Sequence, residues 1–191
     1  MEPSHGKITL HSKNRPGYML QRDHLLDWRT VEGNVLLGLQ VKGILNDDTR
    51  AFAHSLLETY GLSDFIKNYP RQLSGGMRQK VALIRTLACS PELLLLDEPF
   101  SALDYQTRLK ACDEIYGIIR NEGKTAILVT HDISEAISMS DRILVFSSRP
   151  ARIKAEHKVT LSGGNTPLER RNSPEFKDYF DIIWKEIDHE H

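Results

Sequence analysis

LLLLDEP at residues 93–99 decides the fold: four leucines are followed by two carboxylates and a proline. A short run that is apolar throughout is typical of a strand covered on both faces, as in a parallel sheet. The carboxylates then lie where the strand ends, at the edge where open α/β folds bind ligands. Asp97 is therefore a candidate to bind Mg²⁺, directly or through water, and Glu98 a candidate to polarise an attacking water. The alternative is a strand that ends in a solvated acidic turn.

The segments around this strand alternate between strands and helices. Apolar runs at 125–130 and 142–147 predict two more strands, and the stretches 104–121 and 133–139 predict helices. This order indicates βαβ units and a parallel sheet. The remaining expected elements are strands at 7–10, 17–21 and 151–161, mostly helical structure over 30–90, and an amphipathic helix at 174–188.

The composition describes an ordinary soluble domain. The chain has 191 residues, of which 40% are hydrophobic, enough to bury a core. Its 25 Lys and Arg against 26 Asp and Glu give no polycationic signal, so we expect no nucleic-acid partner. The apolar runs are too short to span a bilayer, and the N-terminus has no signal-peptide core. We therefore expect the chain to stay in the cytoplasm.

A second segment of interest is LSGGMRQK at residues 73–80. Two glycines at the start of a helix leave backbone N–H groups free, and these form an anion site. The hydroxyl of Ser74 can donate a further hydrogen bond to a phosphate oxygen. Taken alone, however, the segment is better explained as a glycine-containing loop with a serine N-cap.

Together these segments resemble the ATPase subunits of ABC transporters. LSGGMRQ is similar to the family's signature motif and LLLLDEP to its Walker B motif. SALD at 101–104 resembles the D-loop, His131 in VTHD the switch histidine, and Gln21 the glutamine of the Q-loop. All five occur in the family's order between residues 17 and 132. The one mild departure is Met77, where the family often has glutamine.

The resemblance implies an α/β fold of the P-loop NTPase (RecA-like) type, with a parallel sheet and an inserted helical signature subdomain. It divides the chain into the end of an N-terminal core with the Q-loop, the helical subdomain, the core from Walker B to the switch histidine, and a C-terminal extension. We place these parts at 1–25, 26–90, 91–150 and 151–191.

The resemblance also implies a dimeric ATPase, with ATP and Mg²⁺ held between two subunits. Phosphoryl transfer of this kind depends on positioning and charge stabilisation. The implied catalytic residues are Glu98, His131 and Gln21, and Asp97 and Gln21 are the implied Mg²⁺ contacts. The implied contacts to the partner's ATP are Ser74, Gly75, Gly76 and Gln79, with Asp104 coupling the two sites.

The P-loop of this family, G-x-x-x-x-G-K-[ST], has no match in the sequence. Gly6 and Lys7 are followed by Ile8, so this pair fails. The triplet GKT at 123–125 is preceded at the required position by Ile118 rather than glycine. It also follows a helix and precedes a strand, which is the reverse of the P-loop order.

In the family the P-loop precedes the Q-loop, so we expect its strand and helix to belong upstream of Met1. The chain would then be a fragment, the product of a wrong start site or a split gene. We further expect the missing strand to lie between the strands at 93–97 and 125–129. Both of those strands would then have an unpaired edge.

Features outside the motifs point to the kind of transporter. The segments LLDWRTVEGNVLLGL at 25–39 and VFSSRPARI at 145–153 resemble the nitrate, sulfonate and taurine importers. Expected partners are a second ATPase subunit (an identical copy or a sister subunit), transmembrane permease subunits, and indirectly a solute-binding protein. We expect this chain itself to lie at the inner face of the cell membrane. Trp28 and the apolar residues 35–37 either line the groove for the permease or pack within the helical subdomain. Two other readings are a non-catalytic regulatory subunit and a soluble ABC ATPase outside transport.

Overall fold

The structure is a computed structural model, which describes residues 6–7, 9 and 16–188. The strand expected at 7–10 lies partly outside the described residues. The strands are β1 (Gly17–Met19), β2 (Leu93–Asp97), β3 (Thr125–Val129), β4 (Arg142–Phe146) and β5 (Ile153–Lys158). The helices are α1 (Val31–Val35), α2 (Leu37–Val41), α3 (Asp47–Thr59), α4 (Gly75–Leu87), α5 (Tyr105–Asn121), α6 (Ile133–Met139), α7 (Pro167–Arg170) and α8 (Pro174–Asp188). Two 3₁₀ turns, Ser63–Phe65 and Pro70–Gln72, lie between α3 and α4.

Within residues 16–188, a parallel sheet of order β1-β2-β3 confirms the expected α/β architecture. The central strand β2 pairs with β1 through Leu94, Leu95 and Leu96, and with β3 along all five of its residues. Because these strands are parallel, their carboxyl ends meet at one edge of the sheet.

Two expectations about strand order are wrong. The strand at 142–147 does not join the parallel sheet but pairs antiparallel with β5. The strand at 93–97 pairs directly with the strand at 125–129, so no strand lies between them. Among the described residues, β3 pairs on one side only, and β4 pairs only with β5. β3 and β4, which follow one another in the chain, therefore each have an open edge, as do β1 and β5.

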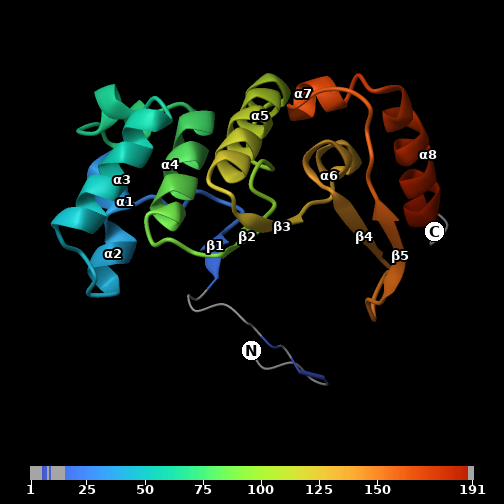
Figure 1. The fold of residues 1–191 in the computed structure, drawn as a ribbon, viewed down its shortest axis with the longest axis horizontal. Helices are drawn as coiled ribbons and strands as arrows, with labels where there is room; N and C mark the ends of the chain where they lie inside the picture. The colour runs from blue at the N-terminus through green and yellow to red at the C-terminus, as the bar shows by residue number, and fades with distance from the viewer. Residues whose placement is uncertain (1–5, 8, 10–15, 189–191) are drawn as a thin grey trace.

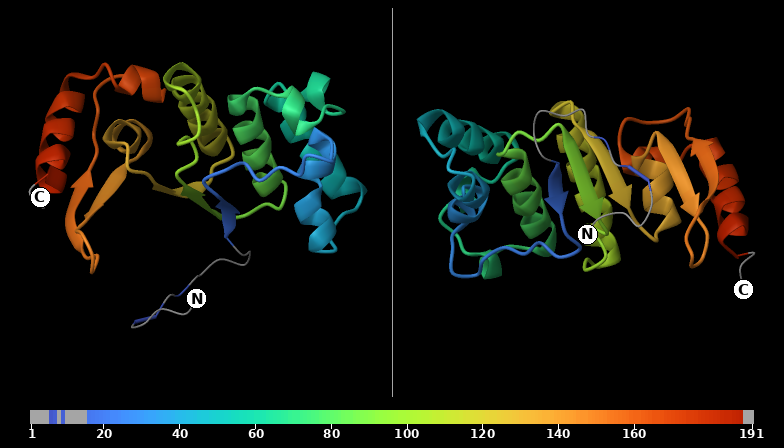
Figure 2. Two further views of the ribbon diagram at one scale, coloured as in Figure 1. Left: turned by 180° about the vertical axis from the view of Figure 1, so that it is seen from behind. Right: turned by 90° about the horizontal axis from the view of Figure 1, so that it is seen from below.

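The helices gather on one face of the strands. Leu94 and Leu96 are buried against them, and Figure 1 shows α4, α5 and α6 on the same side of the strands. Side chains alternate along a strand, so the row Tyr18–Leu95–Ile127 points the other way. Tyr18 and Ile127 are each 51% exposed. The view from below in Figure 2 shows the strands lying in front of the helices.

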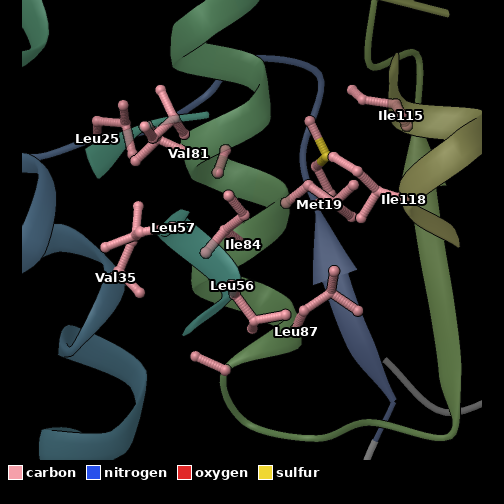
Figure 3. Packing of buried hydrophobic residues seen from close by; sticks show 14 of the residues in the cluster. Met19, Leu25, Val35, Leu56, Leu57, Val81, Ile84, Leu87, Ile115 and Ile118 are labelled. Carbon is pink, nitrogen blue, oxygen red and sulfur yellow. The ribbon is translucent and has the colours of Figure 1, made fainter. Parts of the chain in front are cut away.

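Two hydrophobic clusters hold the described part of the chain together. The larger one runs from β1 through α1 to α5, and Figure 3 shows Met19 of β1 among Ile84 and Leu87 of α4 and Ile115 and Ile118 of α5. The smaller one joins α6, β4 and α8 through residues that include Ile137, Ile143, Val145 and Ile183. The division into four parts at 25, 90 and 150 stays a prediction.

β1 lies unusually close to α4, and Gly17 makes this approach possible. A Cβ atom at Gly17 would lie 2.5 Å from Cγ2 of Thr86 and 2.9 Å from Cγ of Pro91. Real side chains do not approach so closely, so the position requires glycine. The first strand is thereby pressed onto the helix that begins just after Ser74.

We expect Gly17→Ala to lower the free energy of unfolding by about 1–3 kcal/mol, the usual cost of overpacking a core. Urea unfolding measures this change. Replacing Thr86 with serine removes the Cγ2 methyl group that would clash with the new Cβ atom. The double variant Gly17→Ala/Thr86→Ser should therefore recover part of the lost stability.

Gly117→Ala in α5 is the matched control for this prediction. A Cβ atom there meets nothing within 4 Å. Because glycine costs backbone entropy inside a helix, this variant should instead be more stable by roughly 0.5–1 kcal/mol. Equal effects at both glycines would contradict the proposed steric origin.

Candidate functional site

Two side chains from the ends of the strands on either side of β2 converge on the carboxylate of Glu98. Gln21, two residues after β1, donates from Nε2 to Oε2 of Glu98 at 3.0 Å. His131, two residues after β3, places Nδ1 3.1 Å from Oε1 of Glu98. The imidazole is largely exposed, whereas Glu98 is sheltered between its two partners. The structure thus brings the three expected catalytic residues together.

The backbone of Glu98 is itself in an uncommon conformation. Its φ angle is 44°, in the left-handed region that non-glycine residues rarely adopt. Its N–H donates to the carbonyl of Val129 at 2.8 Å, and its carbonyl accepts from the hydroxyl of Ser101 at 3.0 Å. These bonds hold the strained residue between β3 and the segment 101–104. Strain of this kind is typical of functional sites. The local sequence contains no residue that would predict it.

Asp97 has a partner that the sequence did not suggest. The hydroxyl of Tyr18 in β1 donates to Oδ2 of Asp97 at 2.9 Å. This bond raises the pKa of the Tyr18 phenol above its ordinary value, because the phenolate would lose the bond; desolvation and the negative charge of Asp97 add to the effect. The bond holds one oxygen of Asp97 at the sheet edge and leaves Oδ1 for another contact.

We expect Asp97→Asn to lower the pKa of Tyr18 toward that of an ordinary tyrosine, because the substitution removes the negative charge and the carboxylate acceptor. Absorbance at alkaline pH measures the titration of the tyrosines. Tyr18→Phe identifies the component that belongs to this residue. An unchanged Tyr18 titration in Asp97→Asn would rule out this pair.

The loop that carries His131 is held by a network that the sequence also did not reveal. Oγ1 of Thr130 accepts from the N–H of Asp132 at 3.0 Å and donates to Oε2 of Glu135 at 2.7 Å. Asp132 caps α6 by accepting from the N–H of Glu135 at 3.1 Å. Arg108 of α5 lies 3.6 Å from Asp132 and 3.9 Å from Glu135. Burial raises the pKa of Glu135, and the Thr130 bond opposes this.

Arg108 also reaches back to the D-loop segment at 101–104. Its Nη2 donates to the carbonyl of Leu103 at 3.0 Å. A small cavity lies between Glu98, Ser101, Arg108 and the loop around His131. The loop with His131 and the segment with Asp104 are thus fixed relative to one another through a single guanidinium.

The second group of expected site residues lies at the beginnings of α4 and α5. Oγ of Ser74 accepts from the N–H of Met77 at 3.2 Å, so Ser74 is the N-cap of α4. Asp104 caps α5 in the same way through Thr107, and this lowers the pKa of Asp104. A Cβ atom at Gly75 would lie 2.7 Å from the side chain of Leu103. The two helix starts are therefore in direct contact.

Gly76 and Gln79 differ in what they offer to a ligand. Gly76 is partly exposed, and a Cβ there would lie 3.4 Å from Cγ2 of Thr107. Gln79 is only 3% exposed, and its Oε1 has no hydrogen-bond partner in the structure. The side chain of Gln79 thus points into the protein, whereas Ser74 is exposed.

The site has no metal-binding cluster made of protein groups alone. Among the described residues, no group of three or more His, Cys, Asp or Glu gathers to hold an ion. Asp97 offers one free carboxylate oxygen beside Glu98. Mg²⁺ is commonly bound by one or two carboxylates together with phosphate oxygens. The donors therefore fit Mg²⁺ that arrives with a nucleotide better than Mg²⁺ alone.

Comparison with known proteins agrees with this geometry. The family model described as ABC transporter matches residues 1–101, more than half of the chain. The chain belongs to the ABC transporter family. It is an ATP-binding subunit of this family, and its membership of the family makes it an ATPase.

Three ABC proteins with curated names are among the relatives of this chain. The uncharacterized ABC transporter ATP-binding protein YtlC of Bacillus subtilis is 45% identical over 194 residues, covering 98% of this chain and 75% of the relative. The nitrate import ATP-binding protein NrtD of Synechocystis is 40% identical, covering 87% of this chain and 65% of NrtD. The taurine import ATP-binding protein TauB of Escherichia coli is 42% identical, and the match covers 90% of this chain and 71% of TauB. The chain is thus shorter than each of these relatives.

A solved ABC structure shows the same fold. The ATP-binding cassette MJ0796, a dimer in a post-hydrolysis state bound to ADP and Pi, matches with a TM-score of 0.59 and 31% identity. The match covers 77% of this chain and 64% of that one. None of the helices within the described residues has the length and hydrophobicity of a membrane-spanning segment.

Proposed function

We propose that the chain is the ATP-hydrolysing subunit of an importer for a small solute of the nitrate, sulfonate or taurine kind. The observation that carries the proposal is the convergence of Gln21 and His131 on Glu98 at the edge of the parallel sheet. The relatives NrtD and TauB, which are named for nitrate and taurine import, support the solute class.

In this proposal Glu98 orients and polarises the attacking water. Its two partners, the amide of Gln21 and the imidazole of His131, fix both carboxylate oxygens, so Glu98 is held in one position before a substrate arrives. Such preorganisation is what phosphoryl transfer requires, because its catalysis rests on positioning and charge stabilisation. His131, which is more exposed than Glu98, contacts the γ-phosphate, and Gln21 senses the Mg²⁺ and the water.

Asp97 is the residue proposed to hold Mg²⁺, with Gln21 beside it. Tyr18 leaves Oδ1 of Asp97 available for this role. When bound there, Mg²⁺ would be held by Asp97 and would neutralise negative charge on the phosphate groups.

Ser74, Gly75, Gly76 and Asp104 act on the partner subunit's ATP in this proposal. They lie together at two helix starts, where backbone N–H groups and the positive end of each helix favour an anion. Gln79 was expected with this group, but its burial leaves it without access to a ligand in this structure. We therefore assign the phosphate contact to Ser74, Gly75 and Gly76.

The 191 residues contain no G-x-x-x-x-G-K-[ST], so we propose that this polypeptide alone binds Mg-ATP only weakly and does not turn it over. The P-loop supplies the backbone cradle and the lysine for the phosphates, and no described segment replaces them. Calorimetry of the purified chain should show no micromolar binding of Mg-ATP. Tight binding, with turnover that disappears in Glu98→Gln, would falsify this part of the proposal.

A mixed dimer with a P-loop-bearing sister subunit should have one working site. That site combines the sister's P-loop with Ser74, Gly75 and Gly76 of this chain. Ser74→Arg should therefore abolish the ATPase rate, because a bulky cation replaces the hydroxyl that meets the phosphate. Glu98→Gln in this chain should barely change it, since Glu98 serves the other site. The reverse pair of effects would contradict the assignment.

The proposed partners are transmembrane permease subunits, which this chain would contact at the inner face of the cell membrane, and through them a solute-binding protein. Trp28 follows Gln21 closely and is 75% exposed, which suits a contact with another protein. Val35 and Leu36 are buried, so for them packing within the helical part is the correct explanation. Co-purification should recover a permease and no nucleic acid. Recovery of ribosomes or DNA without a permease would count against transport.

A further inference from the structure

The hairpin of β4 and β5 presents apolar side chains that the core does not use. Along β4, Ile143 and Val145 are buried in the smaller hydrophobic cluster. Because side chains alternate along a strand, Leu144 and Phe146 point to the opposite side. Phe146 is 58% exposed, and Ile153, its neighbour across the hairpin, is 60% exposed. Two large apolar side chains are therefore paired at the end of the hairpin and largely open to solvent.

The loop between the two strands, residues 147–152, carries two exposed arginines. Within the part of the chain that the structure describes, the guanidinium groups of Arg149 and Arg152 have no ion pair or hydrogen bond. Ser147 closes the neck of the loop: its N–H donates to the carbonyl of Arg152 at 2.9 Å, and its Oγ accepts from the N–H of Arg152 at 3.0 Å. Two unpaired positive charges are thus held beside the apolar pair. Together these residues, 146–153, form the hairpin tip.

The hairpin differs in charge from the rest of the chain. Residues 142–158 contain five Lys or Arg and one Asp or Glu, whereas the whole chain has 25 against 26. The one acidic residue, Glu156, lies 3.4 Å from Arg142 and is therefore already paired. The positive charge of the hairpin tip is not balanced within the hairpin.

The hairpin tip also projects from the body of the protein. Figure 1 and the left view of Figure 2 show the turn between β4 and β5 extending beyond α6 and α8. A projecting turn has no hollow in which a small ligand could lie. Its exposed apolar and basic side chains instead suit contact with an extended surface.

We infer that the hairpin tip binds the surface of an anionic lipid bilayer. The side chains of Phe146 and Ile153 enter the boundary between the headgroups and the acyl chains. The guanidinium groups of Arg149 and Arg152 contact the lipid phosphates, which arginine binds well because its planar group can donate two parallel hydrogen bonds. Apolar insertion combined with basic residues is what holds peripheral proteins on negatively charged membranes.

A lipid surface fits these observations better than an acidic protein does. A bilayer accepts projecting apolar side chains wherever they meet it, whereas a protein partner needs a pocket of matching shape. The inference goes beyond the proposed function, because it assigns to this chain a contact with lipid that requires neither ATP nor a permease.

Sedimentation of the whole chain with lipid vesicles tests the inference. The chain should bind vesicles made of phosphatidylcholine and phosphatidylglycerol in equal parts, and bind pure phosphatidylcholine roughly tenfold more weakly. Because the attraction is electrostatic, binding should weaken as the salt concentration rises. Arg149→Gln/Arg152→Gln should lower the partition coefficient on the anionic vesicles roughly twenty-five-fold, since each basic residue near such a surface contributes about fivefold. Phe146→Ser should lower it about tenfold.

Arg71→Gln/Lys110→Gln is the matched control. It removes the same charge from two exposed positions outside the hairpin, in the turn Pro70–Gln72 and in α5. Its partition coefficient should equal that of the unaltered chain. An equal loss of binding in this control would show that net charge, rather than the hairpin tip, governs binding, and would overturn the assignment.

Phe146→Trp gives a second readout, which does not depend on the arginine variants. Its emission, measured as the difference from the unaltered chain with Trp28 and Trp184, should shift to the blue on anionic vesicles and be quenched by brominated acyl chains. Bound protein without this shift would refute insertion of the tip, and equal binding to both kinds of vesicle would refute the role of lipid charge.

Polyglutamate separates a membrane contact from a protein contact. If the chain binds polyglutamate through Arg149 and Arg152 but not anionic vesicles, the hairpin tip is a protein-docking surface and the inference is wrong. The vesicles contain neither nucleotide nor permease, so this result and the ATPase tests of the proposed function can fail separately.

Discussion

The pairing of β2 with both β1 and β3 is the constraint on which the rest of the structure depends. Because all three strands run the same way, Gln21, Glu98 and His131 reach the same edge although they lie far apart in the sequence. Burial of Leu94 and Leu96 under the helices stabilises this arrangement through the hydrophobic effect. The carboxylates that follow are then held at the edge without any need for a long ordered loop.

The local parts of the fold could be read from the sequence, because their signals are local. The four leucines at 93–96 predicted a buried strand, and the apolar spacing at 174–188 predicted α8. The resemblance implied that Gln21, Glu98 and His131 belong to one site, and their direct contacts came from the structure. Strand order could not be read, because an apolar run looks the same whichever neighbour it pairs with. For this reason β4 was placed in the wrong sheet, and β2 and β3 were wrongly separated.

The sequence also could not predict the contacts that support the site, because they join residues that lie far apart in the chain. Tyr18 and Asp97 are 79 positions apart, and neither residue is unusual in its own segment. Arg108 meets the loop around His131 only once α5 and α6 are packed together. The left-handed conformation of Glu98 has no signal at all, because glutamate is not a residue that favours it. Gln79 shows the opposite error: a motif position was assigned to a ligand, although the helix turns it inward.

The different depths of His131 and Glu98 set an order of contact. The imidazole is 72% exposed and the carboxylate behind it 29%. An anion that approaches from solvent therefore meets a neutral or positive ring before it comes near a negative charge. In the proposed function this difference in depth keeps an entering phosphate at the imidazole, and the greater separation from the carboxylate lowers the repulsion between the two negative groups.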